Sequence, residues 1–470
     1  MTQNQTTWLN QVYRYQLASA IVIAFLQFIL LLLIGRNLGG DALGWFTVVQ
    51  LAYRMAHSIF DPGMWIATIQ KRVWNFALAK RLLSFQGLWL VICLCFFIFY
   101  FIQSFHPAPY FTLTLILCIS IFVLIAIGSQ YSSALIREDK QREWLIIQLI
   151  AYSLEFIFIL LGLEKFEPLI LFCSGIFIRF GILYLLSFLV YTRVLQKEQQ
   201  LEEPKELVTM SNYHVATQGL SYLQGNYDTV LVGSLFGLSI LGLYNLACEL
   251  CYILFSKLNP VFNKTVFSVL SRKDFENNTN QIRLKTILSY LYLLLPAHIV
   301  LFFNLETIFK WIYERNEKDL LLVAGYFSLI ALIKGVSNIL TNFVLTEGRS
   351  KLIFYWNLVV AIFNYLIILF FLFNKISLPH FLQFQLIYSF FLLFITILYI
   401  LKEGYLTVEK SEKQWFLFLL TVLLWLGIIV GLKDYFFGLT YFCLCIVSYL
   451  LIFYLCNKAK LIQLLQLKIS

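Results

Sequence analysis

Charge is scarce in this sequence. Charged residues make up 13% of the 470 residues, about half the share found in an average soluble domain. Hydrophobic residues account for 60%, and apolar runs recur from residue 15 almost to residue 456. A water-soluble core cannot bury that much apolar surface. The sequence therefore excludes a soluble protein and predicts an all-α, polytopic membrane protein.

Motifs of ATP-driven and hydrolytic enzymes are also lacking. The sequence contains no G-x-x-x-x-G-K-[ST], no G-x-S-x-G and no H-E-x-x-H motif, and no cytoplasmic segment long enough for an ATPase domain. Its nine cysteines all lie in apolar segments, which is typical of small buried hydrophobes rather than metal ligands. We expect no cofactor, and protons or Na⁺ are the candidate coupling ions.

Fourteen apolar runs approach the length of about 20 residues that one bilayer crossing needs. They lie at 12–34, 43–70, 82–102, 110–135, 145–163, 169–191, 209–232, 238–262, 285–303, 319–345, 352–373, 380–401, 414–432 and 435–456. With the N-terminus inside, 24 of the 35 Lys and Arg residues fall on the inner side, 7 in the outer loops and four within spans. This asymmetry predicts cytoplasmic termini. It also explains the net charge of +10 without a nucleic-acid partner.

A repeat relates the two halves of the chain at a shift of 198 residues. The matched pairs are Gly35 with Gly233, Gly39 with Gly237, Gly44 with Gly242, Asp61 with Asn259, and Pro62 with Pro260. The shift spans six helices, an even number, so both halves enter the membrane in the same direction. The repeat therefore predicts two six-helix lobes related by a pseudo-twofold axis along the membrane normal, with two helices added at the C-terminus.

We expect the lobes at 1–198 and 199–401, separated within the polar loop Thr192–Val208, and the two added helices with a cytoplasmic tail at 402–470. Each glycine set is expected on a tight outer loop between the first two helices of its lobe, and each proline bends the second helix. The expected hinge residues are Gly35, Gly39, Pro62, Gly233, Gly237 and Pro260.

Polar side chains form stripes on three otherwise apolar helices. The stripes consist of Arg54, His57, Ser58 and Asp61; His214, Gln218, Ser221, Gly225 and Asp228; and Lys334, Asn338, Thr341 and Asn342. Each set has the spacing of one helix face. A lipid-facing charge at the bilayer centre costs about 2.5–3.5 kcal/mol. The stripes therefore predict one hydrated cavity between the lobes, and unrelated helix-to-helix hydrogen bonds are the alternative.

Four further charges need separate interpretation. Glu155 and Arg179 lie at similar distances from the loop around Phe166, which places them at the same depth on adjacent antiparallel helices. We expect a buried ion pair, with Arg179 as a cavity cation as the alternative. Lys257 is either a cavity cation or a side chain that snorkels to the cytoplasmic surface. Arg14 is either an inner cavity cation or a boundary residue.

A cavity whose fixed charges are Arg and Lys suits an anionic substrate, because these side chains bind phosphate oxygens. The predicted substrate-binding residues are Arg14, Arg54, Arg179, Lys257 and Lys334. His57, Asp61, Glu155, His214 and Asp228 are the predicted coupling or cavity-tuning residues.

Three stretches carry a family resemblance: Leu38 to Gln70, Tyr227 to Arg272 and Asn338 to Asn357. Through them the chain resembles the Wzx-type polysaccharide flippases of the polysaccharide transporter family, most closely the colanic-acid-exporter branch, within the multidrug/oligosaccharidyl-lipid/polysaccharide exporter superfamily. The pattern Asp-x4-Gly-x3-Gly-x4-Gly-x-Tyr from Asp228 to Tyr244 is the most specific part. Glu249 and Lys257 depart from the usually more neutral helix, and residues 316–319 form a charged outer loop.

The resemblance implies a flippase of the bacterial inner membrane, which moves undecaprenyl-diphosphate-linked oligosaccharides by alternating access for O-antigen, capsule or exopolysaccharide synthesis. The implied partners are the lipid-linked oligosaccharide, membrane lipids, and a polysaccharide polymerase with chain-length proteins. Related lipid II flippases use cavity arginines near the inner ends of the first two helices, where Arg14 and Arg54 lie. Three rivals remain: a cation-coupled multidrug-type antiporter, a lipid II flippase, and a membrane glycan polymerase or ligase, which the short outer loops disfavour.

Overall fold

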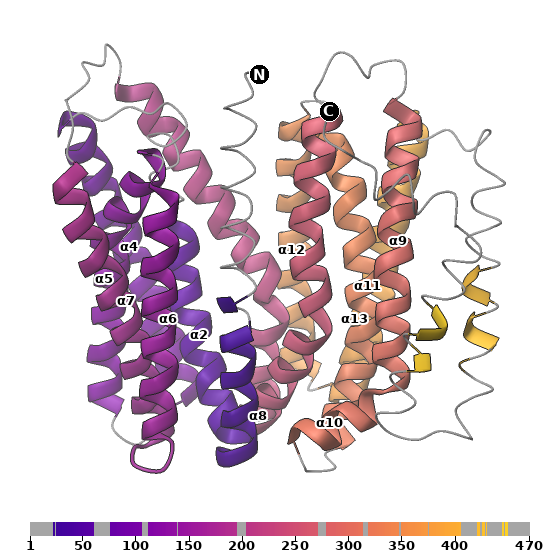
Figure 1. Ribbon diagram of the computed structural model, residues 1–470, viewed down its shortest axis with the longest axis horizontal. Coiled ribbons are helices and arrows are strands. Elements are labelled where there is room, and N and C mark those ends of the chain that lie inside the picture. The colour runs from indigo at the N-terminus through magenta and orange to yellow at the C-terminus, as the bar shows by residue number, and fades with distance from the viewer. Residues whose placement is uncertain are drawn as a thin grey trace. The chain divides into compact units, whose positions relative to one another are not determined.

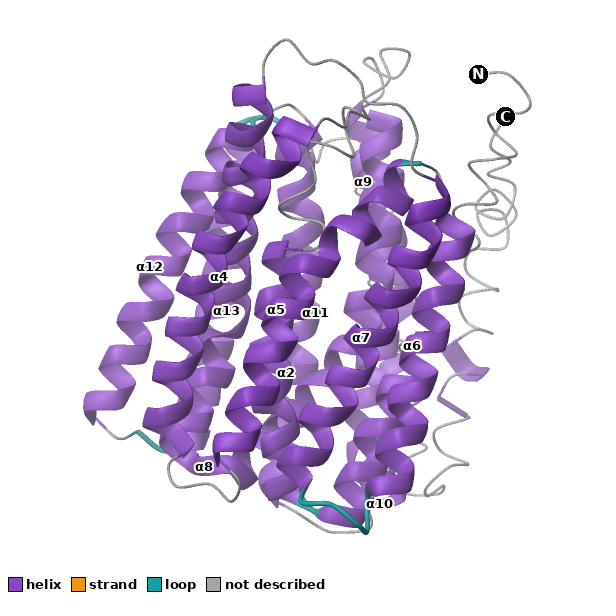
Figure 2. Ribbon diagram, turned by 90° about the vertical axis from the view of Figure 1, so that its left-hand side faces the viewer, coloured by secondary structure: helices purple, strands orange, loops and turns teal. Residues whose placement is uncertain are grey.

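The structure is a computed structural model. It describes residues 22–23, 25–60, 76–105, 111–138, 140–194, 204–270, 279–313, 318–346, 349–374 and 376–405, and the short pieces 421–423, 425–427, 429, 444–445 and 447–449. Within these residues the regular structure is helical and no strand occurs (Figure 2). The all-α fold expected from the sequence is confirmed.

Long helices follow one another along the chain (Figure 1). Their bounds are α2 Gly40–Phe60, α4 Phe76–Phe105, α5 Phe111–Arg137, α6 Gln141–Gly162, α7 Pro168–Val194, α8 Pro204–Leu270, α9 Thr279–Phe303, α10 Leu305–Tyr313, α11 Lys318–Thr346, α12 Ser350–Asn374 and α13 Leu378–Lys402. A shorter apolar helix, Phe25–Leu38, precedes α2. These elements match the predicted spans within the described residues, and the count of fourteen stays a prediction.

Eight of the described helices are long and apolar enough to cross a membrane. Their exposed surfaces carry large apolar side chains: Phe373 on α12 is 83% exposed and Ile387 on α13 is 68% exposed. Such surfaces are stable only against lipid. The chain is therefore a multi-pass membrane protein, as its composition predicts.

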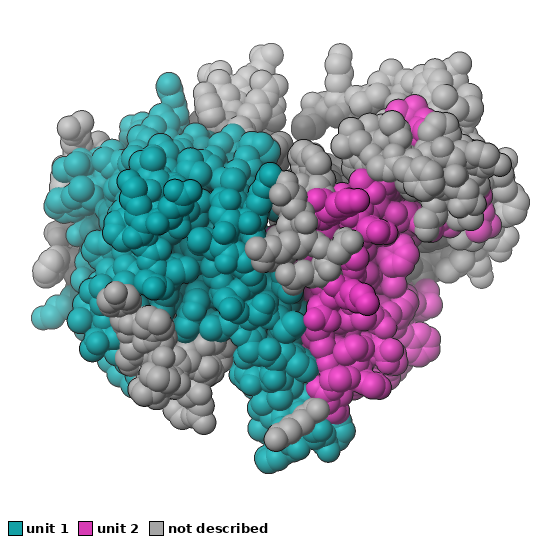
Figure 3. Space-filling model, turned by 90° about the horizontal axis from the view of Figure 1, so that it is seen from below, with its two compact units in different colours: residues 1–245, 357–375 teal, residues 246–356, 376–470 magenta. Residues whose placement is uncertain are grey.

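Packing divides the chain into two compact units, coloured separately in Figure 3. Unit 1 comprises Met1–Asn245 and Asn357–Lys375, and unit 2 comprises Leu246–Trp356 and Ile376–Ser470. The division falls within α8 and α12, whereas the sequence repeat places lobe boundaries at 198 and 401. The predicted lobes describe internal sequence symmetry and stay a prediction.

In unit 1, α7 packs against both α5 and α6, and the three helices lie side by side (Figure 1). Phe172 and Ile176 of α7 are fully buried in this bundle. Close approach depends on glycine, because a Cβ on Gly128 of α5 would lie 2.0 Å from the Tyr184 ring of α7. In a membrane the hydrophobic effect does not drive helices together, so close packing depends on small residues that let the backbones approach.

In unit 2, α11 packs against α9 and α13. Tyr290 and Leu294 of α9 are buried in one apolar cluster with Ile339 and Phe343 of α11. Near the C-terminus, Trp425 is fully buried, and its Nε1 donates a hydrogen bond to Cys445 O at 3.1 Å.

The helix breaks of the two repeats occur at matched glycines. Gly39 has a φ of 88° and Gly237 a φ of 83°, in the left-handed range that favours glycine. Gly237 separates two helical arms of α8. The other two glycines that were expected on outer loops, Gly35 and Gly233, are buried inside helices. The expectation was wrong for this pair. One glycine per half is enough because the connection is a single-residue break rather than an open loop.

Next to these breaks, the two repeats touch in a reciprocal way within unit 1. A Cβ on Gly44 would lie 2.1 Å from Leu238 O, and a Cβ on Gly242 would lie 2.3 Å from Gly40 O. Under the shift of 198 residues, Gly44 matches Gly242 and Gly40 matches Leu238, so each contact is the symmetry partner of the other. Reciprocal contacts of this kind are the signature of a twofold axis. The axis predicted from the repeat thus has a structural counterpart.

The segment from Asn304 to Lys318, expected as an outer loop, contains the short helix α10. Leu305, Ile308 and Phe309 recur at helical spacing and give this helix one apolar face. Phe309 is buried at 2% exposure. A helix of nine residues was missed because a search for runs of about 20 residues passes over it.

Candidate functional site

The structure describes most of the predicted site residues, but not all. Arg14, Asp61 and Pro62 lie outside the described residues. His214, Lys257 and Pro260 lie within α8, where only their helical backbone is described. The roles expected for these six residues stay predictions.

Arg179 of α7 and Glu155 of α6 form a buried ion pair in unit 1. Arg179 Nη1 donates hydrogen bonds to both carboxylate oxygens, at 3.0 Å to Oε1 and 2.8 Å to Oε2. The side chains are only 2% and 4% exposed. Such a pair offsets the cost of removing two charges from water only if its geometry is good and further contacts exist. The predicted ion pair is confirmed.

Aromatic rings surround the guanidinium group of Arg179. Its Cζ lies 4.4 Å from the ring centre of Tyr53, 4.7 Å from that of Phe180 and 4.9 Å from that of Tyr152. Each distance falls within the range of a cation–π interaction. Arg179 is therefore held by a carboxylate and three rings from α2, α6 and α7, which is the environment of a structural cation.

The polar face of α2 borders this ion pair. Arg54 is half-buried, and its charge acts on Glu155 and Tyr152. The His57 ring is half-buried and its centre lies 5.8 Å from that of Phe180. Arg54 and Arg179 thus both act electrostatically on the carboxylate of Glu155.

In unit 2, Lys334 lies within α11, in a candidate membrane span of 27 residues. Its Nζ donates a hydrogen bond to the Tyr252 hydroxyl at 2.9 Å and lies 5.2 Å from the centre of that ring. Among the described residues, no carboxylate forms an ion pair with Lys334. The side chain is half-buried. Lys334 is therefore a cation inside the membrane whose neighbour is a neutral phenol.

The face of α11 that carries Lys334 continues with amides and a hydroxyl. Asn338 is exposed, and Asn342 Nδ2 donates hydrogen bonds to Asn338 Oδ1 at 3.0 Å and Asn338 O at 3.1 Å. Thr341 is half-buried beside them. Exposed amides are costly in hydrocarbon. This stripe is therefore suited to a hydrated space rather than to lipid.

The predicted polar stripe of α8 is partly exposed and partly buried. Ser221 and Gly225 are exposed, whereas Asp228 is 4% exposed. Asp228 Oδ1 accepts a hydrogen bond from Thr229 N at 2.8 Å, and Oδ2 accepts one from the Tyr244 hydroxyl at 3.0 Å. Asp228 and Tyr244 lie on opposite arms of α8, so their bond bridges the break at Gly237. The two ends of the most specific motif thus meet in space.

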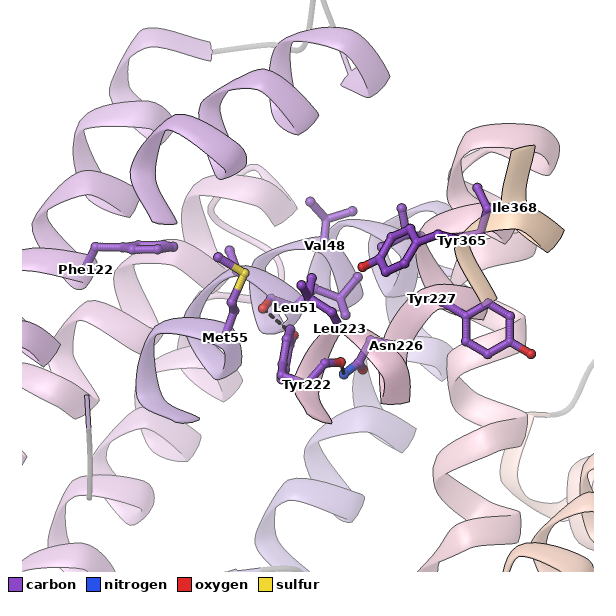
Figure 4. A pocket seen from close by; sticks show the side chains of 12 residues that line it. Val48, Leu51, Met55, Phe122, Tyr222, Leu223, Asn226, Tyr227, Tyr365 and Ile368 are labelled. Carbon is purple, nitrogen blue, oxygen red and sulfur yellow. Dashed lines mark hydrogen bonds between the residues drawn. The ribbon is translucent and has the colours of Figure 1, made fainter. Parts of the chain in front are cut away.

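An apolar crevice lies in unit 1 between α2, α5, the first arm of α8 and α12 (Figure 4). The crevice is lined by Val48, Leu51, Ala52, Met55, Phe122, Tyr222, Leu223, Asn226, Tyr227, Val230, Tyr365 and Ile368. The sequence patterns did not indicate it, because the lining residues come from four separated segments and are mostly ordinary membrane-span residues.

A second group that the sequence did not reveal joins three helix ends in unit 2. Arg349, just before α12, pairs with Glu403 Oε2 at 2.7 Å and donates to the Tyr399 hydroxyl at 3.1 Å. Buried Arg283 of α9 donates to Tyr405 O at 3.2 Å. Both guanidinium groups also lie near the Tyr405 ring. These contacts attach the end of α13 to α9 and α12.

These observations define a polytopic helical membrane protein. Its fold is also found, over almost the whole chain, in a protein of solved structure. The chain superposes on lipid II flippase MurJ in its inward closed conformation with a TM-score of 0.71. The superposition covers 96% of this chain and 99% of that chain, at 15% sequence identity. At this identity, the likeness shows the fold.

The chain belongs to the polysaccharide biosynthesis protein family, whose sequence profile matches residues 33–321. It is 21% identical over 159 residues to the teichuronic acid biosynthesis protein TuaB of Bacillus subtilis (strain 168), covering 33% of this chain and 32% of that protein. It is 24% identical over 353 residues to an uncharacterized membrane protein in the cps region of Klebsiella pneumoniae, covering 68% of each. The resemblance to Wzx-type flippases agrees with these findings.

Proposed function

We propose that the protein is a transporter that flips an undecaprenyl-diphosphate-linked oligosaccharide across the bacterial cytoplasmic membrane. Family membership supports a role in polysaccharide synthesis, and the MurJ fold supports flipping of a lipid-linked sugar. The excess of Lys and Arg on one side supports cytoplasmic termini. The product would enter a surface polysaccharide such as O-antigen, capsule or exopolysaccharide.

One observation carries the proposal: Lys334 is a half-buried cation with a neutral partner at 2.9 Å. A charge exposed to lipid at the bilayer centre costs about 2.5–3.5 kcal/mol, and a bound anion would offset that cost. A diphosphate supplies that anion. The amides of Asn338 and Asn342 continue along the same helix and are suited to sugar hydroxyls, since amides both donate and accept hydrogen bonds.

The other predicted residues have different roles in this proposal: binding the head group, holding helices together or coupling to an ion. Arg54 is the second diphosphate-binding candidate because it is a half-buried cation on the polar face of α2. Arg14 and Lys257 remain candidates for the same headgroup, and Arg179 acts mainly by holding α2, α6 and α7 together through its ion pair and ring contacts. His57, Asp61, Glu155, His214 and Asp228 are the candidates for coupling to H⁺ or Na⁺.

Alternating access would use the glycine breaks. We assign Gly39 and Gly237 as hinges, with Pro62 and Pro260 as bending points and Gly35 and Gly233 as packing positions. The reciprocal contact of Gly44 and Gly242 would close the outer side. Gly44→Ala tests this, because its Cβ would meet Leu238 O, whereas nothing lies within 4 Å of a Cβ on Gly87 of α4. Transport should fall with Gly44→Ala and persist with Gly87→Ala; equal transport by both variants contradicts the closure.

Purified protein in liposomes tests the function directly. The vesicles contain a fluorescent undecaprenyl-diphosphate oligosaccharide in the inner leaflet, and a membrane-impermeant quencher reports its arrival outside. We expect flipping by the wild type and a loss of at least about tenfold with Lys334→Ala, equivalent to 1.4 kcal/mol. A wild-type protein that flips no polyprenyl-diphosphate sugar would overturn the proposal.

A further inference from the structure

The crevice of unit 1 is lined mainly by aliphatic side chains and aromatic rings. Two of its polar groups are bonded within its own wall: the Tyr222 hydroxyl donates to Leu51 O, and Asn226 Nδ2 donates to Tyr222 O at 2.9 Å. The dashed lines in Figure 4 mark these bonds. Water needs several polar partners to occupy a buried site. A crevice with this lining therefore favours an apolar chain over water.

The same crevice reaches the lipid-facing surface along α12. Tyr365, which lines it, is 37% exposed, and its neighbours Ile362, Leu366 and Leu369 are 53%, 55% and 51% exposed. Asn364 of this helix is buried, and its Nδ2 donates to Gln224 O of α8 at 3.4 Å. The wall that borders lipid is thus attached to α8, and an apolar chain can enter from the bilayer without crossing water.

Polar positions adjoin the crevice on the same helices. In the sequence of α2, Arg54 lies between the lining residues Leu51 and Met55, and on α8 exposed Ser221 directly precedes the lining residue Tyr222. A cation and a hydroxyl beside an apolar crevice match a molecule with an anionic head and a long hydrocarbon tail. Bulk phospholipid does not need such a cation deep within the spans.

We propose that the crevice holds part of the polyprenyl chain of the lipid-linked substrate. The inference rests on the proposed function and adds a tail site to it. Four aromatic rings and the Met55 thioether form much of the lining, and such adaptable, polarizable surfaces pack well against bulky, branched groups. A methyl-branched, unsaturated chain meets more of this surface than a straight acyl chain.

Photo-crosslinking of the full-length protein tests the site. The benzophenone amino acid replaces Tyr365 in the crevice or, as a control, Phe390 of α13, which is 54% exposed. The protein is placed in nanodiscs of phosphatidylethanolamine and phosphatidylglycerol with a small fraction of undecaprenyl phosphate. We expect polyprenyl adducts at position 365 enriched about tenfold over their share of the lipid, and adducts in proportion to composition at 390. Adducts in proportion at both positions would overturn the proposal.

A variant with a larger side chain in the crevice tests the tail site separately from the flippase function. Leu223→Trp narrows the crevice, and Ile127→Trp places the same ring at a 53% exposed position of α5 as the matched control. We expect Leu223→Trp to lower flipping of an undecaprenyl substrate severalfold and to leave a short-prenyl analogue unaffected, with both variants melting like the wild type. If Leu223→Trp flips both substrates normally, the tail site is wrong and the flippase function stands. If Leu223→Trp lowers the melting temperature, Val230→Phe is used in its place, and the same results for the two substrates are expected or would overturn the tail site.

Discussion

Two cations in the membrane-spanning region have opposite surroundings. Arg179 in unit 1 is 2% exposed and bonded to a carboxylate within three aromatic rings. Lys334 in unit 2 is half-buried beside a phenol. Arginine has the planar, always charged group suited to a fixed buried pair, whereas lysine is a flexible point charge. The comparison separates a cation that holds helices together from one whose hydrogen-bond partner is neutral.

This difference makes the two cations fail in different ways. Removal of a partner from a buried pair leaves a charge without compensation, so the damage appears in stability. Removal of a cation whose partner is neutral leaves only a hydrogen-bonding group without its donor, so the damage appears in transport. Stability and transport measured on the same variants therefore test the comparison.

The largest effect is expected for Glu155→Gln. Loss of the carboxylate leaves Arg179 buried and unpaired, which should lower the free energy of unfolding by about 3–5 kcal/mol. Thermal unfolding in detergent measures this, with exposed Glu164→Gln as the control. The double variant Glu155→Leu/Arg179→Met should recover much of the loss. A Glu155→Gln protein as stable as the wild type would show that the pair is dispensable.

Replacement of Lys334 by Met should act on transport instead. We expect flipping to fall by at least about tenfold, 1.4 kcal/mol, while the melting temperature stays near that of the wild type. Lys334→Arg should keep a substantial part of the activity because it keeps the charge. Lys402→Met, at an exposed position at the end of α13, is the control. If Lys334→Met melts as early as Glu155→Gln, the two cations play the same role and the comparison fails.

A smaller loss of stability, expected for Arg179→Lys, distinguishes the charge of Arg179 from the planar shape of its guanidinium group. Arg179→Lys keeps the charge but loses the planar group that stacks on Tyr53, Tyr152 and Phe180, so we expect a loss of about 1–2 kcal/mol in the free energy of unfolding. Chemical denaturation measures it, and Arg349→Lys at a half-exposed surface pair should change stability very little. An unaltered Arg179→Lys protein would mean that the rings contribute only packing.

The Glu155–Arg179 pair could be predicted because a short connection joins α6 and α7. Two antiparallel helices with a tight turn bring residues equidistant from the turn to the same depth. Lys334 and Tyr252 are 82 residues apart, and no short turn relates them, so the neutral partner of Lys334 could not be found from spacing. The same reason hides the apolar crevice, whose walls meet only through tertiary packing.

The fold was predictable where hydrophobic length decides it. Long spans such as α5, α7 and α11 match the apolar runs, and the repeat identified Gly39 and Gly237. The sequence could not tell those two glycines from Gly35 and Gly233, because glycine is compatible with both helical and left-handed backbone. Nor could it reveal which glycines approach another backbone, since that depends on contacts nearly 200 residues away.

The reciprocal contact of Gly44 and Gly242 is made chiefly against backbone atoms. It is therefore encoded by the absence of side chains at a few positions, and no particular chemical group has to be matched across it. Side chains around this seam can therefore change without disturbing it, provided that Gly44 and Gly242 stay without a Cβ.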